Sequence, residues 1–290
     1  MLLERIPDEF DGLVAVKGEA PGCKGIGKYE LERVIAEGGM GLVYEAQDSV
    51  FRRTVALKVL RKERCSSEAR DRLRREARIT ATLRHPNIIA VLEAGSCESW
   101  GSSYIALEYI HGRTLLEAIH EEKAPLLRAV ETVARAVAHA HDRGVLHCDL
   151  KPSNVLLEKG GRVVLTDFGL GRSAASEALW EIVGTPAYMA PEQANGWVRE
   201  IDERTDVYGL GALLYETLSG RPPFEGETAL AVLDQIGRDD PPGLGTREWP
   251  AIDRLEAVCR KAMSKHKSHR YPTACAFAEA LAQIRESFWE

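Results

Sequence analysis

The residues best suited to chemistry lie in one short polar stretch and at a second acidic position that follows it. The stretch carries Asp149, Lys151 and Asn154, and the later position is Asp167. Transfer of a phosphoryl group from a nucleotide to a hydroxyl needs a carboxylate that takes the hydroxyl proton, oxygen ligands for Mg²⁺, and a cation that balances the charge on the moving group. Asp149 can be the carboxylate and Lys151 the cation. Asn154 and Asp167 can supply the oxygen ligands, so the pattern favours phosphoryl transfer.

The order of these residues resembles two motifs of a known family. The motifs are His147-Cys148-Asp149-Leu150-Lys151-Pro152-Ser153-Asn154 and, after a short hairpin, Asp167-Phe168-Gly169. Together they resemble the catalytic loop and the metal-binding motif of eukaryotic-type (Hanks-type) protein kinases. The resemblance implies that ATP binds with Mg²⁺ or Mn²⁺, that Asp149 and Lys151 act at the substrate hydroxyl, and that Asn154 and Asp167 hold the metal.

Further residues are typical of the serine/threonine kinases in this family. Lys151 stands two residues after Asp149, where tyrosine kinases of the family place other residues. The resemblance also implies that Thr185 is a catalytic residue whose hydroxyl bonds the aspartate and the lysine. The run that follows resembles bacterial kinases of the PknB type: Met189-Ala190-Pro191-Glu192-Gln193. The expected activity is that of a non-specific serine/threonine protein kinase, which transfers the γ-phosphate of ATP to serine and threonine hydroxyls of proteins.

The resemblance covers about residues 29–284 and implies an α+β, bilobal protein-kinase fold. We expect a small five-stranded antiparallel lobe with one helix over residues 29–108, and a larger, mainly helical lobe over residues 109–290. Residues 1–28 are expected to be a flexible leader. The alternative is a short ordered strap that packs on the small lobe.

Glycines between two strand-like segments are candidates for a phosphate-binding loop. Segments 29–35 and 42–46 have strand character, and the turn between them is rich in glycine. A dinucleotide site of the Rossmann kind has a helix after the turn, which argues against that kind of site here. The resemblance implies a loop whose backbone closes over the phosphates of ATP, because glycine has no Cβ in the way. The alternative is a plain hairpin turn. The loop residues are Ala36, Gly38, Gly39 and Gly41, with alanine at the family's first glycine.

One lysine lies inside an apolar strand and needs a partner. Lys58 is the one charged residue of segment 55–59, and an unpaired buried charge is very costly. The resemblance implies that Lys58 binds the α- and β-phosphates of ATP and pairs with Glu76, on a helix expected over 67–83. Glu68 is the alternative partner, although an acid in the first turn is explained by the helix dipole.

The resemblance also implies an adenine site at the last strand of the small lobe. The ring would bond to the backbone of Glu108 and Ile110. Four apolar side chains would contact it, and each of them taken alone is ordinary core: Leu107, Val43, Ala56 and Leu156.

Apolar periodicity in the second half of the chain predicts two long helices, over 126–142 and 205–219. The second is apolar nearly all round, so we expect it in the core of the large lobe. Asp206, near its start, resembles the acid that anchors the backbone of the catalytic loop. Glu192 and Arg270 are expected to form a buried bidentate ion pair.

Cys148 is the most informative departure from the family pattern. Most members have an arginine there, which binds a phosphate on the activation segment. Cysteine cannot do this, and where relatives carry the phosphorylated threonine the short segment 171–183 has Glu177 or Leu179. We therefore expect activity that does not depend on a phosphorylated threonine in this segment. Ser173 and Ser176 are the remaining candidates for phosphorylation. A redox role for Cys148 is the alternative to that of a passive small residue.

Two other functions remain open. A pseudokinase that acts as a nucleotide-responsive signalling scaffold would fit Ala36, Cys148 and Thr80, the last at a position where the family has a bulky apolar residue. Against it, every residue that touches ATP, metal or hydroxyl in the family is present. A small-molecule phosphotransferase on the same fold is disfavoured by the Glu192 and Arg270 pair, which serves peptide docking.

Composition limits the partners and the location. The chain has 290 residues, a net charge of −6 and a sequence pI near 5.8, which argues against nucleic-acid binding. Its six cysteines form no CxxC pair, so neither a zinc site nor a disulfide framework is indicated. No apolar run approaches the roughly 20 residues of a membrane helix, and the acidic start is unlike a secretory signal. We expect a cytoplasmic protein with protein substrates, without nucleic acid or membrane contact, and with a homodimer as a family-based expectation.

Overall fold

The computed structural model describes most of the chain, in two compact units. The described residues are 15–16, 25–37, 41–60, 66–97, 101–119, 123–168, 172–173, 186–244 and 249–289. The small unit is drawn from residues 1–84 and 89–110, and the large unit from 85–88 and 111–290. The expected lobes, 29–108 and 109–290, differ from these units chiefly at the segment 85–88, which belongs with the large unit.

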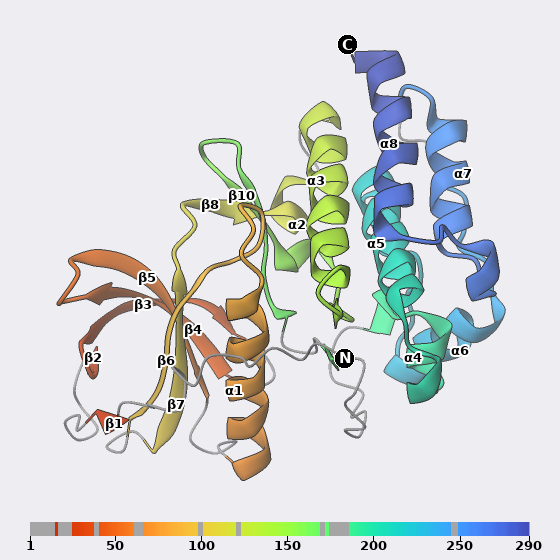
Figure 1. Ribbon diagram of the computed structural model, residues 1–290. Helices are drawn as coiled ribbons and strands as arrows, with labels where there is room; N and C mark the ends of the chain where they lie inside the picture. The colour runs from red at the N-terminus through yellow and green to blue at the C-terminus, as the bar shows by residue number, and fades with distance from the viewer. Residues whose placement is uncertain are drawn as a thin grey trace. The chain divides into compact units, whose positions relative to one another are not determined.

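The small unit is one sheet with one helix packed on it (Figure 1). Its sheet has the order β1-β6-β7-β5-β4-β3-β2. Five long strands pair antiparallel, as the sequence predicts. These strands are β3 (Tyr29–Glu37), β4 (Gly41–Asp48), β5 (Arg53–Leu60), β6 (Val91–Cys97) and β7 (Ser102–Glu108). The core on one face of the sheet is apolar and includes Tyr29, Leu57 and Tyr104.

Two strands of two residues each extend this sheet and correct the expected start of the lobe. They are β1 (Ala15–Val16), parallel to β6, and β2 (Gly25–Ile26), antiparallel to β3. Ile26 is buried in the core of the sheet. The end of the expected leader, 25–28, is therefore part of the small unit. The rest of it, except for β1, lies outside the described residues.

The helix of the small unit, α1 (Ser67–Thr82), begins and ends close to its predicted bounds. Ser66 caps it by accepting a hydrogen bond from the Ala69 N–H at 3.2 Å, which satisfies one of the free N–H groups of the first turn. Leu73 and Ala77 are buried on its inner face, and α1 packs against β6 and β7.

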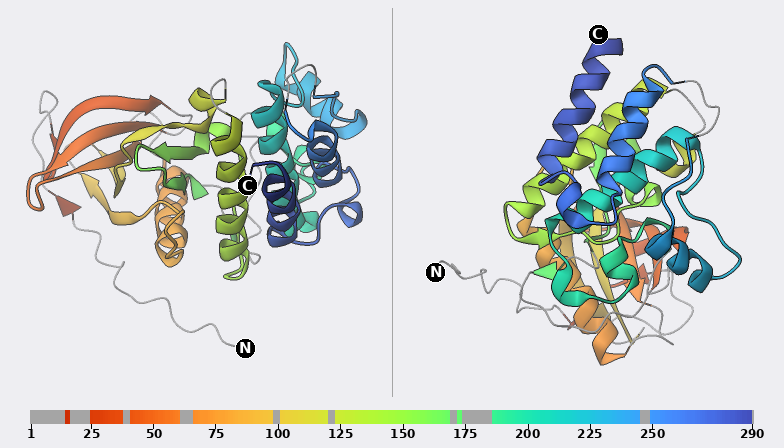
Figure 2. Two further views of the ribbon diagram at one scale, coloured as in Figure 1. Left: turned by 90° about the horizontal axis from the view of Figure 1, so that it is seen from above. Right: turned by 90° about the vertical axis from the view of Figure 1, so that its right-hand side faces the viewer.

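The large unit is built around α5 (Glu203–Ser219). Every residue from Thr205 to Leu218 is buried, as expected for a helix that is apolar nearly all round. Asp202 caps its start, and Gly220 ends it in the left-handed region at φ 79°, where glycine has no steric penalty. The helix, teal in Figure 2, packs against three others. These are α3 (Lys123–His141), α7 (Ile252–Ala262) and α8 (Ala274–Trp289).

Short elements of the large unit carry the predicted catalytic loop and metal ligands. A three-stranded sheet has the order β11-β10-β8, and β9 (Val145–Leu146) pairs with β12 (Arg172–Ser173). The three strands are β8 (Gly112–Thr114), β10 (Val155–Glu158) and β11 (Val163–Leu165). The remaining helices are α2 (Leu115–Ala118), α4 (Pro191–Ala194) and α6 (Ala229–Arg238). Among the described residues, no helix has both the length and the apolar character needed to cross a membrane.

Two helical glycines give a matched test of this packing. A Cβ at Gly211 would lie 2.7 Å from the Ala262 Cβ and 2.8 Å from the Met263 Cγ, whereas one at Gly237 would meet nothing within 4 Å. Gly211→Ala should therefore destabilise the protein by about 1 to 3 kcal/mol through overpacking of α5 against α7. Gly237→Ala should stabilise it by up to about 1 kcal/mol, because alanine favours the helix. Urea unfolding measures both changes, and a stabilising Gly211→Ala would contradict the packing described.

Candidate active site

The backbone of the catalytic loop is held by one buried carboxylate. Asp206, in the first turn of α5, is 1% exposed. Its two oxygens accept the backbone N–H groups of His147, at 2.8 Å, and Cys148, at 2.7 Å. The predicted anchor is confirmed. Since both bonds go to backbone, this contact fixes the path of the loop directly before Asp149.

His147 links the loop to the segment after β11. Its Nδ1 accepts the Asp149 N–H at 3.2 Å, so the ring proton is on Nε2, which donates to the Thr166 carbonyl at 3.1 Å. Complete burial lowers the pKa of His147, in agreement with a neutral ring. The ring also lies 4.6 Å from that of Phe168, which is fully buried. One imidazole thus connects the backbone of Asp149 with the residue that follows Asp167.

The three predicted catalytic side chains of the loop meet one another. Lys151 Nζ lies 2.8 Å from the Asp149 Oδ2. Asn154 Nδ2 donates to the Asp149 carbonyl at 2.8 Å and to Oδ2 at 3.2 Å. The Asp149 side chain is 23% exposed and that of Lys151 is 19% exposed. Asp149 is therefore oriented by a cation and an amide while it remains within reach of a substrate.

The hairpin of β10 and β11 brings the two predicted metal ligands to one end. Val155 pairs with Leu165, and the Thr166 N–H donates to the Asn154 carbonyl at 2.9 Å. Asp167 follows directly, with φ at +62°, a region that disfavours side chains with a Cβ. Because the amide nitrogen of Asn154 is bonded to Asp149, its oxygen is the atom suited to a metal.

These residues fit Mg²⁺ or Mn²⁺ bound together with a nucleotide. Mg²⁺ keeps several waters and is held by one or two carboxylates plus substrate phosphates. One carboxylate and one amide oxygen agree with that. In the part of the chain that the structure describes, no cluster of three or more histidine, cysteine or acidic side chains could form a complete protein cage for a metal.

In the small unit, the predicted lysine and glutamate form an ion pair. Lys58 Nζ lies 2.6 Å from the Glu76 Oε1, and their side chains are 16% and 6% exposed. Glu68 lies in the first turn of α1, where the backbone N–H and the capping serine lower its pKa. Glu76 is thus the partner of Lys58, and the alternative partner is wrong.

Strand register places the predicted nucleotide residues of the small unit on one face. Val43 is opposite Lys58, and Ala56 is opposite Leu107. Residues directly opposite each other, and residues two apart on one strand, point to the same side of a sheet. Val43, Ala56, Lys58 and Leu107 therefore share a face. Val43, Ala56 and Lys58 are only partly buried, whereas Leu57 on the other face is fully buried.

The remaining predicted binding residues are placed as follows. A Cβ at Gly41 would lie 2.1 Å from the Val59 carbonyl oxygen, so only glycine fits there. Ala36 pairs with Val43 in the β3–β4 ladder. The Glu108 N–H donates to the Ala90 carbonyl at 3.0 Å. Ile110 ends the small unit, and Leu156 lies on β10 in the large unit. Gly38, Gly39 and Thr185 lie outside the described residues.

Glu192 and Arg270 form the predicted buried pair. The bonds are 2.7 Å from Nη1 to Oε1 and 2.9 Å from Nη2 to Oε2, and the side chains are 4% and 0% exposed. Thr205 donates to the same Glu192 oxygen at 2.8 Å. A buried bidentate pair of this kind fixes orientation. Here it ties α4 to the segment before α8, and the Thr205 bond ties α4 to the start of α5.

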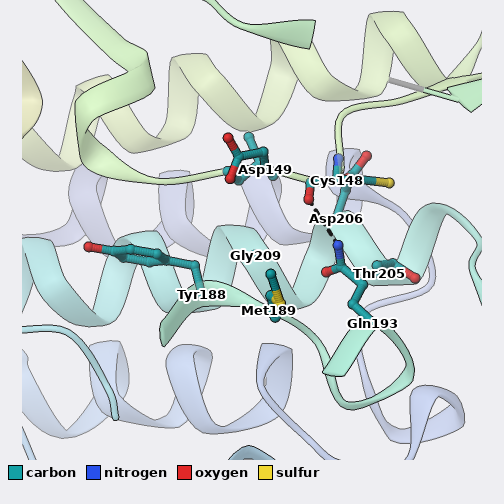
Figure 3. A pocket seen from close by; sticks show the side chains of 9 residues that line it. Cys148, Asp149, Tyr188, Met189, Gln193, Thr205, Asp206 and Gly209 are labelled. Carbon is teal, nitrogen blue, oxygen red and sulfur yellow. Dashed lines mark hydrogen bonds between the residues drawn. The ribbon is translucent and has the colours of Figure 1, made fainter. Parts of the chain in front are cut away.

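A pocket lies beside Asp149 within the large unit (Figure 3). Its empty volume is about 260 Å³, including its open mouth. Besides the anchored loop, the lining residues include Tyr188, Met189 and Gln193. The Tyr188 hydroxyl donates to Glu216 at 2.5 Å, and burial raises the pKa of Glu216. The sequence reasoning identified neither the role of Gln193 nor the Tyr188 contact, because uncharged polar residues follow no hydrophobic period.

Comparisons with known proteins identify the family of the chain. The family model described as "Protein kinase domain" matches residues 29–280. The chain belongs to the protein kinase domain family. Serine/threonine-protein kinase PknB of Mycolicibacterium smegmatis is 38% identical over 276 residues, which is 89% of this chain and 43% of that protein. PknB of Mycobacterium tuberculosis (strain ATCC 25618 / H37Rv) is 37% identical over 274 residues, with the same two shares.

A solved structure shows the same kinase fold. It is the crystal structure of the PknI kinase domain of Mycobacterium tuberculosis, with a TM-score of 0.70 and 29% identity over 92% of this chain and 99% of that one. The predicted α+β kinase fold and the similarity to bacterial Hanks-type serine/threonine kinases are confirmed. The present chain spans less than half the length of the PknB proteins it matches.

A histidine that the motifs did not single out supports the anchor of this kinase loop. His141 Nε2 lies 2.7 Å from the Asp206 Oδ2, and the ring is buried. Burial acts to lower the pKa of His141, but the hydrogen bond and the charge of Asp206 outweigh it, so the pKa is raised. Burial likewise acts to raise the pKa of Asp206, but His141 and the backbone N–H groups lower it.

The raised pKa of His141 gives a stability test with a defined sign. The extra stability is present in full below the unfolded pKa of about 6.5 and is lost as pH rises through the higher folded pKa. His141→Gln keeps an uncharged donor near Asp206. The difference in unfolding free energy between wild type and His141→Gln should therefore be larger at pH 6 than at pH 9 in urea unfolding.

His139→Gln is the matched control for this measurement. Burial, followed by the charge of Arg143, lowers the pKa of His139, so its contribution has the opposite pH dependence. A His141→Gln difference that is constant or grows between pH 6 and pH 9 would show that the His141–Asp206 pair is not charged.

Proposed function

We propose that the protein is a serine/threonine protein kinase that transfers the γ-phosphate of ATP to serine and threonine hydroxyls of proteins. The observation that carries the proposal is the arrangement at Asp149. Lys151 and Asn154 both bond its Oδ2, and Asp206 and His147 hold the backbone around it. This leaves Asp149 as an oriented, solvent-accessible acceptor for the proton of a substrate hydroxyl.

Each residue of the site has a defined role in this transfer. Asp149 accepts the hydroxyl proton, and Lys151 balances the charge on the phosphoryl group as it moves. Lys58, held by Glu76, orients the α- and β-phosphates, and the partly exposed sheet face with Val43 and Ala56 receives the adenine. Asn154 and Asp167 would hold Mg²⁺ or Mn²⁺, which neutralises charge on the phosphates. Thr185 acts with Asp149 and Lys151 in this proposal.

The proposal also covers the partners, the location and the oligomeric state of the enzyme. Its partners are proteins with serine or threonine acceptors, because the Glu192 and Arg270 pair serves peptide docking in this family. The acidic balance of the chain supports a protein substrate rather than nucleic acid. A cytoplasmic location and a homodimer belong to the proposal as expectations from the family and from the composition.

Asp149→Asn tests the assignment most directly. The amide keeps the size of the side chain but cannot take a proton, so kcat for phosphorylation of a generic basic protein should fall by about 10² to 10⁴-fold. Transfer of radiolabel from ATP measures it. Asp142→Asn makes the same change at an exposed position and should leave kcat unaltered. Turnover of Asp149→Asn at the wild-type rate would refute the role of Asp149.

A pseudokinase is the second candidate, and two observations favour it. Cys148 replaces the family's arginine, and Thr80 is a small, polar residue, buried at 4% exposure in α1. The same radiolabel assay separates the two functions. A pseudokinase would bind ATP in a thermal-shift titration and transfer no phosphate, in wild type as in Asp149→Asn.

The cysteine before Asp149 leads to a prediction about regulation. The cysteine has no charge with which to bind a phosphate. The loop is held instead by the hydrogen bonds from its backbone N–H groups to Asp206. Protein stripped of phosphate by a phosphatase should therefore retain most of its activity, with mass spectrometry confirming the loss of phosphate. If the dephosphorylated enzyme were inactive and regained activity on phosphorylation of Ser173 or Ser176, this prediction would be wrong.

A further inference from the structure

Gln193, directly after the Ala190-Pro191-Glu192 run, uses both ends of its amide in buried contacts. Gln193 lies in α4 and is 6% exposed. Oε1 accepts the Ala190 N–H at 3.0 Å, and Nε2 donates to the Cys148 carbonyl at 2.9 Å. The second bond, drawn as a dashed line in Figure 3, joins α4 to the loop residue directly before Asp149.

The two bonds do different things. The bond from the Ala190 N–H to Oε1 satisfies a donor at the start of α4, as a capping side chain does. The bond from Nε2 to Cys148 adds nothing to the helix, because its acceptor lies 45 residues away in the chain. An apolar or acceptor-only side chain could not make it. The amide nitrogen therefore acts on the loop alone.

Cys148 is a residue whose backbone needs such support. Its φ is +62°, in the left-handed region that a residue with a Cβ disfavours. On its amino side, its N–H is held by Asp206 at 2.7 Å. On its carboxyl side, its carbonyl is held by Gln193. The peptide plane before Cys148 is therefore held from α5, and the plane between Cys148 and Asp149 is held from α4.

We propose that Gln193 is a positioning residue for Asp149. By holding the carbonyl of Cys148, it keeps the left-handed turn that directs the Asp149 side chain toward Lys151 and Asn154. The inference rests on the proposed kinase function for its catalytic consequence. Its structural part, that Gln193 holds the loop at Cys148, stands independently of turnover.

Gln193→Glu separates the two arms of the amide. The glutamate has the same length and keeps an acceptor for the Ala190 N–H, but it has no donor for the Cys148 carbonyl. Loss of one such bond should lower kcat by about tenfold. KM for ATP should stay within about twofold, because the substitution affects the position of Asp149 and removes no contact that binds ATP in the ground state.

The same helix offers a matched control. Asn195, directly after the last residue of α4, donates from Nδ2 to the Pro191 carbonyl of that helix at 2.8 Å. Asn195→Asp therefore also replaces an amide donor by a carboxylate and removes one bond to a carbonyl, but it leaves the loop untouched. It should not lower kcat. Gln193→Met is a neutral variant of similar length that lacks both the donor to Cys148 and the acceptor for the Ala190 N–H. It serves if the buried charge of Gln193→Glu lowers the melting temperature below the assay range.

A second substitution gives a result that loss of folding could not produce. Cys148→Gly removes the penalty of the left-handed backbone, since glycine adopts positive φ readily. The fall in kcat caused by Gln193→Met should then be smaller in the Cys148→Gly background than in wild type, in a double-mutant cycle. Equal falls in both backgrounds, or a fall of the same size in Asn195→Asp, would overturn the proposal.

A measurement without turnover completes the test. In folded wild type Cys148 is buried, at 7% exposure, so iodoacetamide should alkylate it slowly. In Gln193→Met, local opening of the loop should raise the rate at Cys148 by about fivefold, followed by mass spectrometry of its peptide. An unchanged rate would overturn the inference. Absence of transfer in wild type would instead refute the kinase function and leave this readout valid.

Discussion

The structure depends first on the contact between one carboxylate and two consecutive backbone N–H groups. Asp206 is inside the most buried helix of the large unit, so the contact joins the centre of the fold to the functional loop. A buried carboxylate is costly unless its oxygens are bonded. Asp206 meets that demand with loop backbone and with His141. The loop therefore cannot leave its position without exposing an unsatisfied charge in the core.

Two ion pairs of the site were predicted because the resemblance to the kinase family implied them. Lys58 in an apolar β-strand also needs a partner of opposite charge, since an unpaired buried charge is very costly. The partners found, Glu76 and Arg270, are the ones expected. Long helices were predictable from their residues, because a buried helix such as α5 has apolar residues on nearly every side.

Features without charge or period could not be predicted. The strand at Ile26 has two residues, too few for an alternating pattern. Cys148 and Asp167 both adopt a φ of +62°, and neither residue type predicts positive φ as strongly as glycine does. Gln193 is similar, since an amide can donate or accept in many settings and its partner is fixed only by tertiary packing.

At position 148 the backbone and the side chain have separate functions. The N–H and the carbonyl of Cys148 are bonded to Asp206 and Gln193, and neither bond depends on which side chain the residue has. An arginine there would add a charge that responds to a phosphate. A cysteine leaves the bonds that place Asp149 intact and removes that response. The geometry of the loop then follows from the packing of α4 and α5, which Glu192 of α4 joins through its bond from Thr205 of α5.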